Sequence, residues 1–226
     1  MEIEEKANNI IKKLQGFANE SKSLFATTSL QSHSIPLLHM ISKVQGEIPV
    51  FFLNTGYHFP ETLKFRDELK TEYGIDIRDL YSFVPKNQQR DDKGRLFFVS
   101  DPDHCCYLNK IQPLEPILAN YDIWVNGIRA DQNINRRNMK EFQETPEGAM
   151  RYHPLLNWTS KMIHDYRKIH ELPKHPLEDK GFFSISCEPC TRRMSSDDLR
   201  EGRWYGLNKT ECGLHTDLVK DKGLEN

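Results

Sequence analysis

The chain has 226 residues and a formal net charge of −2, with 31 Lys and Arg against 33 Asp and Glu. This length allows one large domain or two small ones, and the balanced charge excludes a globally basic nucleic-acid binder. The chain also contains five cysteines, which cannot all pair with one another, so a closed disulfide framework is excluded. The longest apolar run, residues 49–53, is far shorter than the roughly 20 residues needed to span a bilayer. With no secretory signal at the start, we expect a cytoplasmic protein with reduced thiols and no membrane partner.

Apolar residues at helical spacing predict an amphipathic helix over residues 3–18. Residues 23–27 are expected to form a short strand that leads into a loop of small hydroxyl residues. A helical pattern returns over residues 34–44, where a proline near the start is tolerated because the first helical turn has spare N–H groups. The continuous apolar run at residues 48–53 is typical of a buried parallel strand.

The next helix is predicted over residues 60–73 and the next strand over residues 75–83. Residues 121–125 form another apolar run that ends at an Asn-Gly turn, and residues 158–168 repeat aromatic and apolar side chains at helical spacing. This alternation of strands and helices predicts an α/β fold with a doubly wound, mostly parallel sheet.

The last part of the chain has a different composition. Residues 172–189 are rich in proline and irregular, and the tail from residue 197 is polar. We therefore predict one α/β domain over residues 1–196, followed by a loop-rich C-terminal arm over residues 197–226.

Polar loops follow two of the predicted strands, at residues 27–34 and 54–57. Ligands of open α/β sheets bind beyond the carboxyl ends of the strands, and a hydroxyl-rich loop there suits an anion. An ordinary helix cap made by Ser32 or Ser34 explains the same residues. Arg129 follows the strand at 121–125, and its planar guanidinium suits phosphate or sulfate oxygens.

Four of the cysteines form two pairs: Cys105 and Cys106 are adjacent, and Cys187 and Cys190 form a C-x-x-C motif. Three interpretations stay open: structural zinc, an iron–sulfur cluster, or an adjacent pair that are merely small buried hydrophobic residues. Adjacent cysteines match the usual zinc hairpins poorly, whereas a cubane cluster could accept them on neighbouring irons.

Cys212 stands apart from the pairs, in the polar tail between Lys209 and His215. These two neighbours could lower the pKa of its thiol and make it a nucleophile at neutral pH. A solvent-exposed thiol without a function explains the position equally well.

Six segments resemble, in order, those of the assimilatory sulfonucleotide reductases, the adenylyl-sulfate and phosphoadenylyl-sulfate reductases. The family's D-T-G-x-x-F-P-E-T segment is matched by N-T-G-Y-H-F-P-E-T. The other matches are C-C-x-x-x-K, W-x-x-G-x-R-x-x-Q, S-I-S-C-E-P-C-T-R, R-E-G-R-W and K-T-E-C-G-L-H. The resemblance runs over most of the chain, from about Phe25 to His215.

This resemblance implies an adenine-nucleotide α-hydrolase-like fold and the reduction of adenylyl sulfate to sulfite and AMP. Cys212 would attack the sulfur of the substrate and become an S-sulfocysteine, from which thioredoxin or a glutaredoxin-like thiol releases sulfite. The segment 197–226 would then be a mobile arm that carries the catalytic cysteine.

The resemblance also implies the site residues. Lys110 and Arg129 would hold the sulfate and phosphate end of the substrate, and Arg200 and Arg203 would close over it. The two polar loops would contribute further substrate contacts, from Thr27, Thr28, Ser29, Thr55 and Gly56. The paired cysteines mark the members of the family that carry a 4Fe–4S cluster and mostly use adenylyl sulfate. The implied ligands of this cluster are Cys105, Cys106, Cys187 and Cys190.

Three departures from the family pattern weaken the choice of substrate. The loop at residues 27–34 lacks glycine, Asn54 replaces an aspartate, and Asn109 stands where arginine is common. A phosphoadenylyl-sulfate reductase, which would yield adenosine 3′,5′-bisphosphate, is therefore the nearest alternative. Two more distant alternatives are an ATP-consuming enzyme of the same superfamily and a zinc-stabilised nucleotide-binding or redox-sensing module without turnover. A homo-oligomer is left open.

Overall fold

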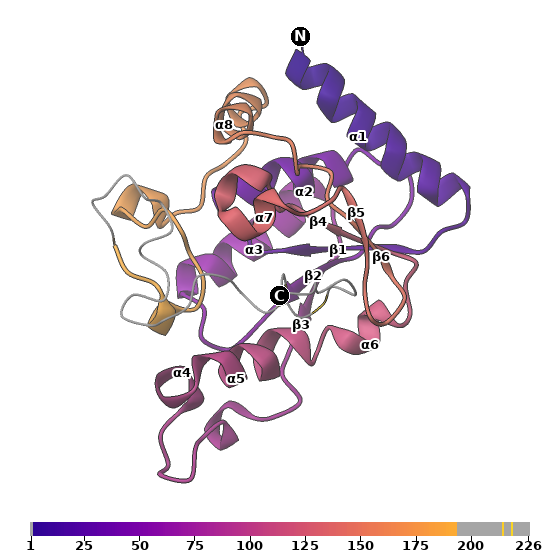
Figure 1. The fold of residues 1–226 in the computed structure, drawn as a ribbon. Coiled ribbons are helices and arrows are strands. Elements are labelled where there is room, and N and C mark those ends of the chain that lie inside the picture. The colour runs from indigo at the N-terminus through magenta and orange to yellow at the C-terminus, as the bar shows by residue number, and fades with distance from the viewer. Residues whose placement is uncertain (1, 194–213, 215–217, 219–226) are drawn as a thin grey trace.

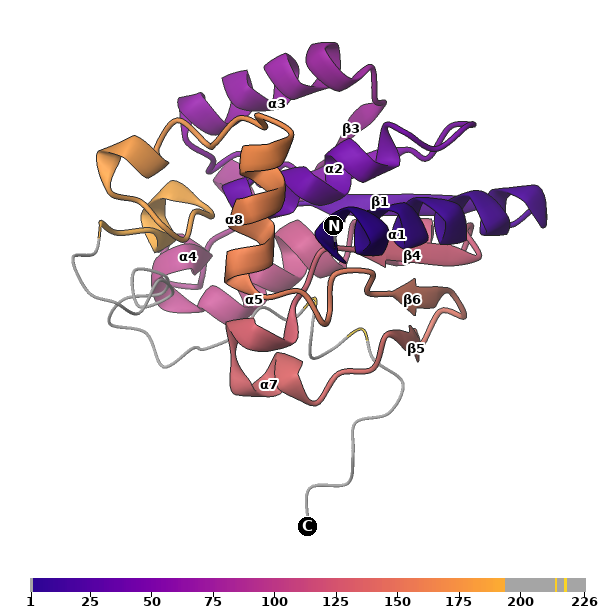
Figure 2. The same cartoon turned by 90° about the horizontal axis from the view of Figure 1, so that it is seen from above.

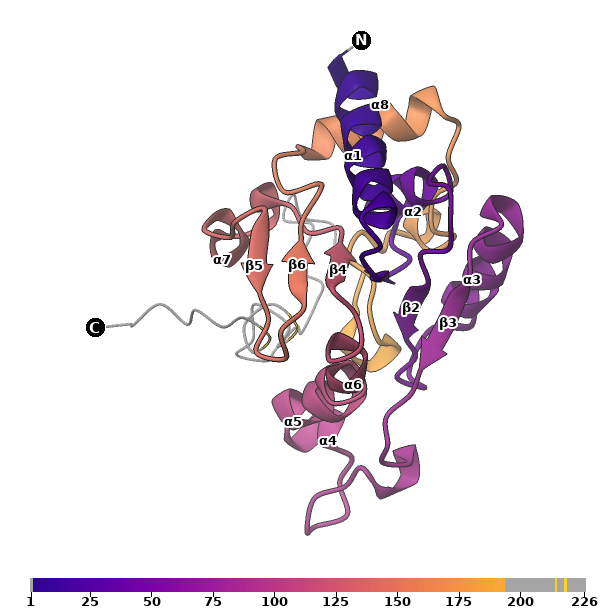
Figure 3. The same cartoon turned by 90° about the vertical axis from the view of Figure 1, so that its right-hand side faces the viewer.

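The computed structural model describes residues 2–193, 214 and 218, and these form a six-stranded sheet of order β3-β2-β1-β4-β6-β5 (Figure 1). Every neighbouring pair of strands is parallel except β5 and β6, which are antiparallel. Figure 3 shows the strands side by side, with β5 at one edge and β3 at the other. The strands are β1 (Leu24–Thr28), β2 (Val50–Leu53), β3 (Ile77–Leu80), β4 (Ile123–Asn126), β5 (Phe142–Glu144) and β6 (Met150–Tyr152).

The longer helices cover one face of the sheet, the face toward the viewer in Figure 2. They bury an apolar stripe against alternate strand residues such as Ala26, Phe52 and Val125, as the pleat of a strand requires. Helix α3 begins at a proline and ends before Gly74, which adopts a left-handed conformation at its C-cap. The helices of this face are α1 (Glu2–Asn19), α2 (Ile35–Ile41), α3 (Pro60–Tyr73) and α8 (Ser160–Ile169).

The opposite face is covered by a run of short helical turns. Strand residues Phe25, Phe51 and Trp124 pack there in a second apolar cluster, which also contains Leu218 with 3% of its surface exposed. The turns are α4 (Phe97–Ser100), α5 (Pro102–Cys106), a π-helical turn (Tyr107–Ile111) and α6 (Glu115–Leu118). A further short helix, α7 (Ile134–Arg137), lies between β4 and β5 along the chain.

The fold predicted from the sequence is confirmed: the sheet is mostly parallel and has helices on both faces. The helix over residues 60–73 has the bounds that were predicted, whereas the one expected over 34–44 starts as a 3₁₀ turn and ends at Ile41. The β5–β6 hairpin was missed. Its strands are three residues each, too short to show a clear alternation, and the signal that was available is the turn sequence Pro-Glu-Gly between them.

The strand order places β1 at the point where the chain switches direction, with β2 on one side and β4 on the other. In doubly wound sheets the ligand binds in the crevice at this switch point, beyond the carboxyl ends of the strands. Apart from Leu214 and Leu218, the arm predicted over residues 197–226 lies outside the described residues.

Candidate functional site

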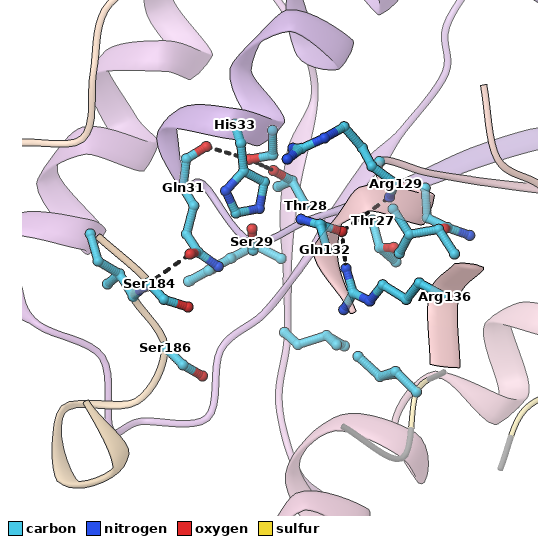
Figure 4. A pocket seen from close by; sticks show the side chains of 18 of the residues that line it. Thr27, Thr28, Ser29, Gln31, His33, Arg129, Gln132, Arg136, Ser184 and Ser186 are labelled. Atoms are coloured by element: carbon cyan, nitrogen blue, oxygen red, sulfur yellow. Dashed lines mark hydrogen bonds between the residues drawn. The ribbon is translucent and has the colours of Figure 1, made fainter. Parts of the chain in front are cut away.

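A cavity of about 470 Å³ opens at the carboxyl ends of β1 and β4, and we call it the polar cavity. Three segments of the chain form most of its wall. Figure 4 shows Gln31, Ser184 and Ser186 on one side of it and Arg129 and Arg136 on the other. Its further polar lining comprises Thr27, Thr28, Ser29, His33, Ser34, His58, Lys110, Asn126, Asp131, Gln132 and Ser160.

The first wall is the loop after β1, which the hydroxyls of the sequence hold in place. The Thr27 Oγ1 accepts a hydrogen bond of 2.8 Å from the indole of Trp124, on the neighbouring strand β4. The Thr28 Oγ1 accepts from the backbone N–H of Leu30, a residue with a left-handed φ of 57°. The side chain of Gln31 accepts from the N–H of Ile185, so this loop is tied to the third wall.

The second wall follows β4 and carries the arginines. Arg129 is 5% exposed and donates to Asp131 and to the hydroxyl of Ser160, both at 2.9 Å. Its Nη1 is buried and has no hydrogen-bond partner among the described residues. Burial lowers the pKa of Arg129, and the carboxylate of Asp131 opposes this effect. A buried guanidinium nitrogen without a partner, next to a cavity, is a donor suited to an anion.

Asn126 is the last residue of β4 and lines the polar cavity with 3% of its surface exposed. Both its amide oxygen and its amide nitrogen are buried, and within the described part of the chain neither has a partner. An amide that is left unpaired here costs free energy unless a ligand or water bonds to it. Sequence reasoning missed this residue, since Asn126 was treated only as part of an Asn-Gly turn.

The third wall is the segment 183–186, together with Leu214. In this segment Ser184 and Ser186 line the polar cavity, whereas the adjacent Cys187 lines a second, smaller cavity. One short segment therefore borders both cavities.

The second cavity contains all four paired cysteines, and we call it the cysteine cavity. Cys105 and Cys106 enter from the end of α5, and Cys187 and Cys190 from a 3₁₀ turn over Glu188–Cys190. The topology thus brings together two pairs that lie about 80 residues apart. No disulfide joins these four cysteines. The remaining lining residues are Thr55, Tyr57, Phe98, Pro102, Asn109, Lys110 and Pro189.

Polar groups surround the sulfur atoms of this cavity. The Thr55 hydroxyl lies 3.2 Å from the Cys187 Sγ, and the Asn109 amide nitrogen lies 3.7 Å from the Cys105 Sγ. Burial, reinforced by Cys187, raises the pKa of Cys105 to about 11, so the free thiol keeps its proton at neutral pH. Among the described residues, no group of three or more His, Cys, Asp or Glu is arranged to hold a metal ion.

Lys110 lines both cavities and is 7% exposed. It belongs to the π-helical turn Tyr107–Ile111, where the Gln112 N–H bonds to the Tyr107 carbonyl five residues earlier. Such turns often occur at functional sites, because the wider turn displaces side chains from the regular helical positions. The nearby His58 is half-buried and packs against Phe52, and burial lowers the pKa of this histidine to about 4. It is therefore neutral at pH 7 and adds no positive charge to the polar cavity.

The structure thus groups most of the predicted site residues. Thr27, Thr28, Ser29, Lys110 and Arg129 line the polar cavity. The expected ligand cysteines lie together in the cysteine cavity. Cys212, Arg200 and Arg203 lie outside the described residues.

Two residues predicted to contact substrate lie elsewhere. Thr55 lines the cysteine cavity, and Gly56 lines neither cavity; its carbonyl accepts from the Lys86 ammonium. Asn54 was expected to influence the pocket, but its side chain donates to Asp79 at 2.9 Å and is not among the lining residues. The loop after β2 thus divides between the two cavities, with Thr55 and Tyr57 at the cysteine cavity and His58 at the polar cavity.

No helix of the described residues is both long and apolar enough to cross a membrane.

The solved structures that resemble this chain show the fold. A phosphoadenylyl-sulfate reductase from Candida auris, in a phosphate complex, has a TM-score of 0.62 at 20% identity and covers 80% of this chain and 94% of its own. An FMN adenylyltransferase from Candida glabrata also has a TM-score of 0.62, at 14% identity, covering 97% of this chain and 72% of its own.

Curated relatives are closer in sequence. An adenosine 5′-phosphosulfate reductase from Halalkalibacterium halodurans is 38% identical over 83% of this chain and 82% of its own length. A phosphoadenosine 5′-phosphosulfate reductase from Gloeobacter violaceus is 37% identical over 85% of this chain and 82% of its own. The family model for the phosphoadenosine phosphosulfate reductase domain matches residues 23–193. This range contains all the lining residues of both cavities named above except Leu214. The chain therefore belongs to the phosphoadenosine phosphosulfate reductase family.

Proposed function

We propose that this protein reduces adenylyl sulfate to sulfite and AMP, through an S-sulfocysteine formed on Cys212. The observation that carries the proposal is the position of Lys110, which lines both the polar cavity and the cavity that contains four cysteines. A cation between a nucleotide-sized site and a group of thiols suits a substrate whose sulfate end lies next to them. Relatives named adenosine 5′-phosphosulfate reductase support the same activity.

The polar cavity suits a mononucleotide. Its volume of about 470 Å³ lies within the range of small-molecule sites, roughly 300–1,000 Å³. Arg129 and Lys110 supply buried positive charge for the sulfate and phosphate groups, and the hydroxyls of Thr28 and Ser29 add neutral donors. We propose that Arg200 and Arg203 complete this set from the C-terminal segment.

The nucleophile of the proposed reaction is the Cys212 thiolate. It attacks the sulfur of adenylyl sulfate, a new S–S bond forms, and the bond between that sulfur and the phosphate oxygen breaks. The electron pair of the broken bond leaves on the phosphate, which departs as AMP, and cations nearby stabilise this charge. The support among the described residues is Leu214, which lines the polar cavity only two positions along the chain from Cys212.

The second half of the reaction needs a dithiol reductant, for which we propose thioredoxin or a glutaredoxin-like protein. One thiolate of the reductant attacks the Cys212 Sγ and expels sulfite, which leaves with the electron pair of the S–S bond. The second thiol of the reductant then resolves the mixed disulfide. The reductant is oxidised by two electrons, and Cys212 returns as a thiolate. Chemistry that depends on reduced thiols suits the cytoplasm.

We further propose that Cys105, Cys106, Cys187 and Cys190 hold a 4Fe–4S cluster. Four cysteines from two tight segments are a suitable donor set for such a cluster. Tetrahedral zinc would need sulfurs about 3.8 Å apart, because each Zn–S bond is about 2.3 Å. The adjacent pair Cys105 and Cys106 also matches the usual C-x₂₋₄-C spacing of zinc sites poorly, which favours a cluster. When bound, the cluster would supply charge close to Lys110.

The choice between two nucleotides is the finer part of the proposal. The presence of the four cysteines and the relatives named adenosine 5′-phosphosulfate reductase support adenylyl sulfate. The 37% identical relative named for the 3′-phosphorylated nucleotide supports the alternative.

Sulfite release from each nucleotide, measured with a thioredoxin system, tests the proposal. We expect a higher kcat/KM with adenylyl sulfate, and a preference for the 3′-phosphorylated form would reverse the choice of substrate. Cys212→Ser should abolish sulfite release while the affinity for AMP and the visible absorbance stay the same. Turnover by this variant would refute the assignment of the nucleophile. Iron and sulfide analysis after anaerobic purification separates the cluster from zinc.

A further inference from the structure

A pair of buried amides lies beside the cysteine cavity, formed by Gln89 and Asn109, each 2% exposed. The Gln89 Nε2 donates to the Asn109 Oδ1 at 3.1 Å, and the Asn109 Nδ2 donates to the Gln89 Oε1 at 2.6 Å. The two side chains therefore form a closed, reciprocal pair, and neither amide can turn over without the loss of both bonds.

The orientation of the pair is fixed from one end. The Gln89 Nε2 also donates to the backbone carbonyl of Val84 at 2.9 Å, which accepts a hydrogen bond but cannot supply one. The Gln89 Nε2 must therefore lie on the side of Val84. This leaves the Gln89 Oε1 to accept from the Asn109 Nδ2. It follows that Asn109 presents its nitrogen, and not its oxygen, on the side toward the cysteines.

The free end of the pair reaches Cys105. Asn109 lies four residues after Cys105, and its Nδ2 is 2.8 Å from the Cys105 carbonyl oxygen and 3.7 Å from the Cys105 Sγ. One N–H of this nitrogen is donated to Gln89, and the other is directed at Cys105, where the carbonyl oxygen and the more distant Sγ share it. Residues four apart in a helical segment lie on the same side, which explains the approach.

We propose that Gln89 is a positioning residue which, through Asn109, holds an N–H donor on the sulfur of Cys105 and so adjusts the electronic properties of the group bound there. This inference rests on the proposed 4Fe–4S cluster. Hydrogen bonds to the ligand sulfurs are among the factors that set the reduction potential of iron–sulfur clusters, and partners of ligands that do not touch the metal fix ligand orientation. An N–H donor draws electron density from the thiolate, so its presence favours the reduced cluster and weakens the iron–sulfur bond.

The test compares Asn109→Leu and Gln89→Met, which keep the approximate side-chain shapes and remove the donors, with Gln88→Ala as a control. Gln88 is the same residue type, one position earlier and exposed. Each holoprotein is examined by resonance Raman spectroscopy of the Fe–Sγ stretch and by redox titration. We expect a stretch at higher frequency and a lower midpoint potential in both variants, and neither change in the control. Because Gln89 acts through Asn109, the double variant should match Asn109→Leu alone.

Additive effects, or an unchanged spectrum in Gln89→Met, would overturn the inference. If either variant fails to bind iron, the circular dichroism and Tm of its apo form decide: an intact fold supports the role toward the sulfur, and a lost fold makes the pair merely structural. The wild-type protein keeps this outcome separate from the proposed function, since its own iron content tests the cluster and its sulfite release tests the reaction.

Discussion

Replacing Arg129 with methionine tests whether the polar cavity binds an anion. The Arg129 guanidinium is buried, and its Nη1 has no partner in the described part of the chain. If this nitrogen bonds the sulfate or phosphate of the substrate, the variant loses a hydrogen bond between charged groups, which contributes about 1.5–3 kcal/mol. At 1.36 kcal/mol for each factor of ten, kcat/KM should fall by about 10- to 150-fold.

The fold should survive this substitution. Asp131 loses its bond to Arg129 but keeps two others, from the N–H of Ser160 at 2.7 Å and from the Ser160 hydroxyl at 3.0 Å. Arg129→Lys retains the charge and loses the planar fork, so its kcat/KM should lie between those of the wild type and Arg129→Met.

The assay is sulfite release at saturating reductant, combined with the Kd for AMP from calorimetry. Arg66→Lys is a control, because Arg66 is likewise an arginine paired with a carboxylate, Asp79, but is half-buried and does not line the polar cavity. It should lower Tm and leave kcat/KM unchanged. A kcat/KM of Arg129→Met within twofold of the wild type, in a folded protein, would refute the assignment of this cavity to an anion.

Three further outcomes follow from the structure. Burial lowers the pKa of four histidines below the usual 6.5, to about 4 for His39, His58 and His175 and to about 3 for His153. The unfolded chain then binds more protons below pH 6.5, so Tm should be constant above that pH and fall as the pH is lowered toward 4; a pH-independent Tm would contradict this. Trp124→Phe removes the hydrogen bond to Thr27, a loss of about 1 kcal/mol that should lower Tm by about 2–4 °C and raise KM. An unchanged KM would show that Thr27 does not shape the site. Leu218→Ala removes a buried side chain from the second apolar cluster, a change that typically costs about 2–5 kcal/mol and should lower Tm; an unchanged Tm would contradict the burial of Leu218.

The sequence was most informative where local pattern and structure depend on the same few residues. The helix over residues 60–73 combines a proline start with a glycine stop, and both act within one turn of the chain. The apolar runs of β2 and β4 could be recognised because strands buried on both faces need no alternation. The carboxyl ends of these strands then indicated where a ligand would bind.

The details of the site were not predictable in the same way, because they depend on contacts between distant residues. Asn54 and Asn126 both end buried strands and precede turns, so the sequence gives them the same appearance. The Asn54 amide bonds to Asp79, whereas the Asn126 amide lines the polar cavity and has no partner among the described residues. The difference comes from the strand order: Asp79 lies on β3, beside Asn54, while Asn126 pairs in register with Thr27 on β1.

The same topology explains why the two cavities lie next to each other and share Lys110. The segment after Phe183 runs between them, with Ser184 and Ser186 on one side and Cys187 on the other. The π-helical turn places Lys110 at the boundary from the opposite direction. Two hydrogen bonds hold the backbone of the segment between the cavities. The N–H of Ile185 donates to the Gln31 side chain, and the N–H of Glu188, in the cysteine turn, donates to the Tyr57 carbonyl. If adenylyl sulfate binds as proposed, a change of charge among the cysteines would act on its sulfate through Lys110 over a short path in a largely buried region, where electrostatic interactions are weakly screened.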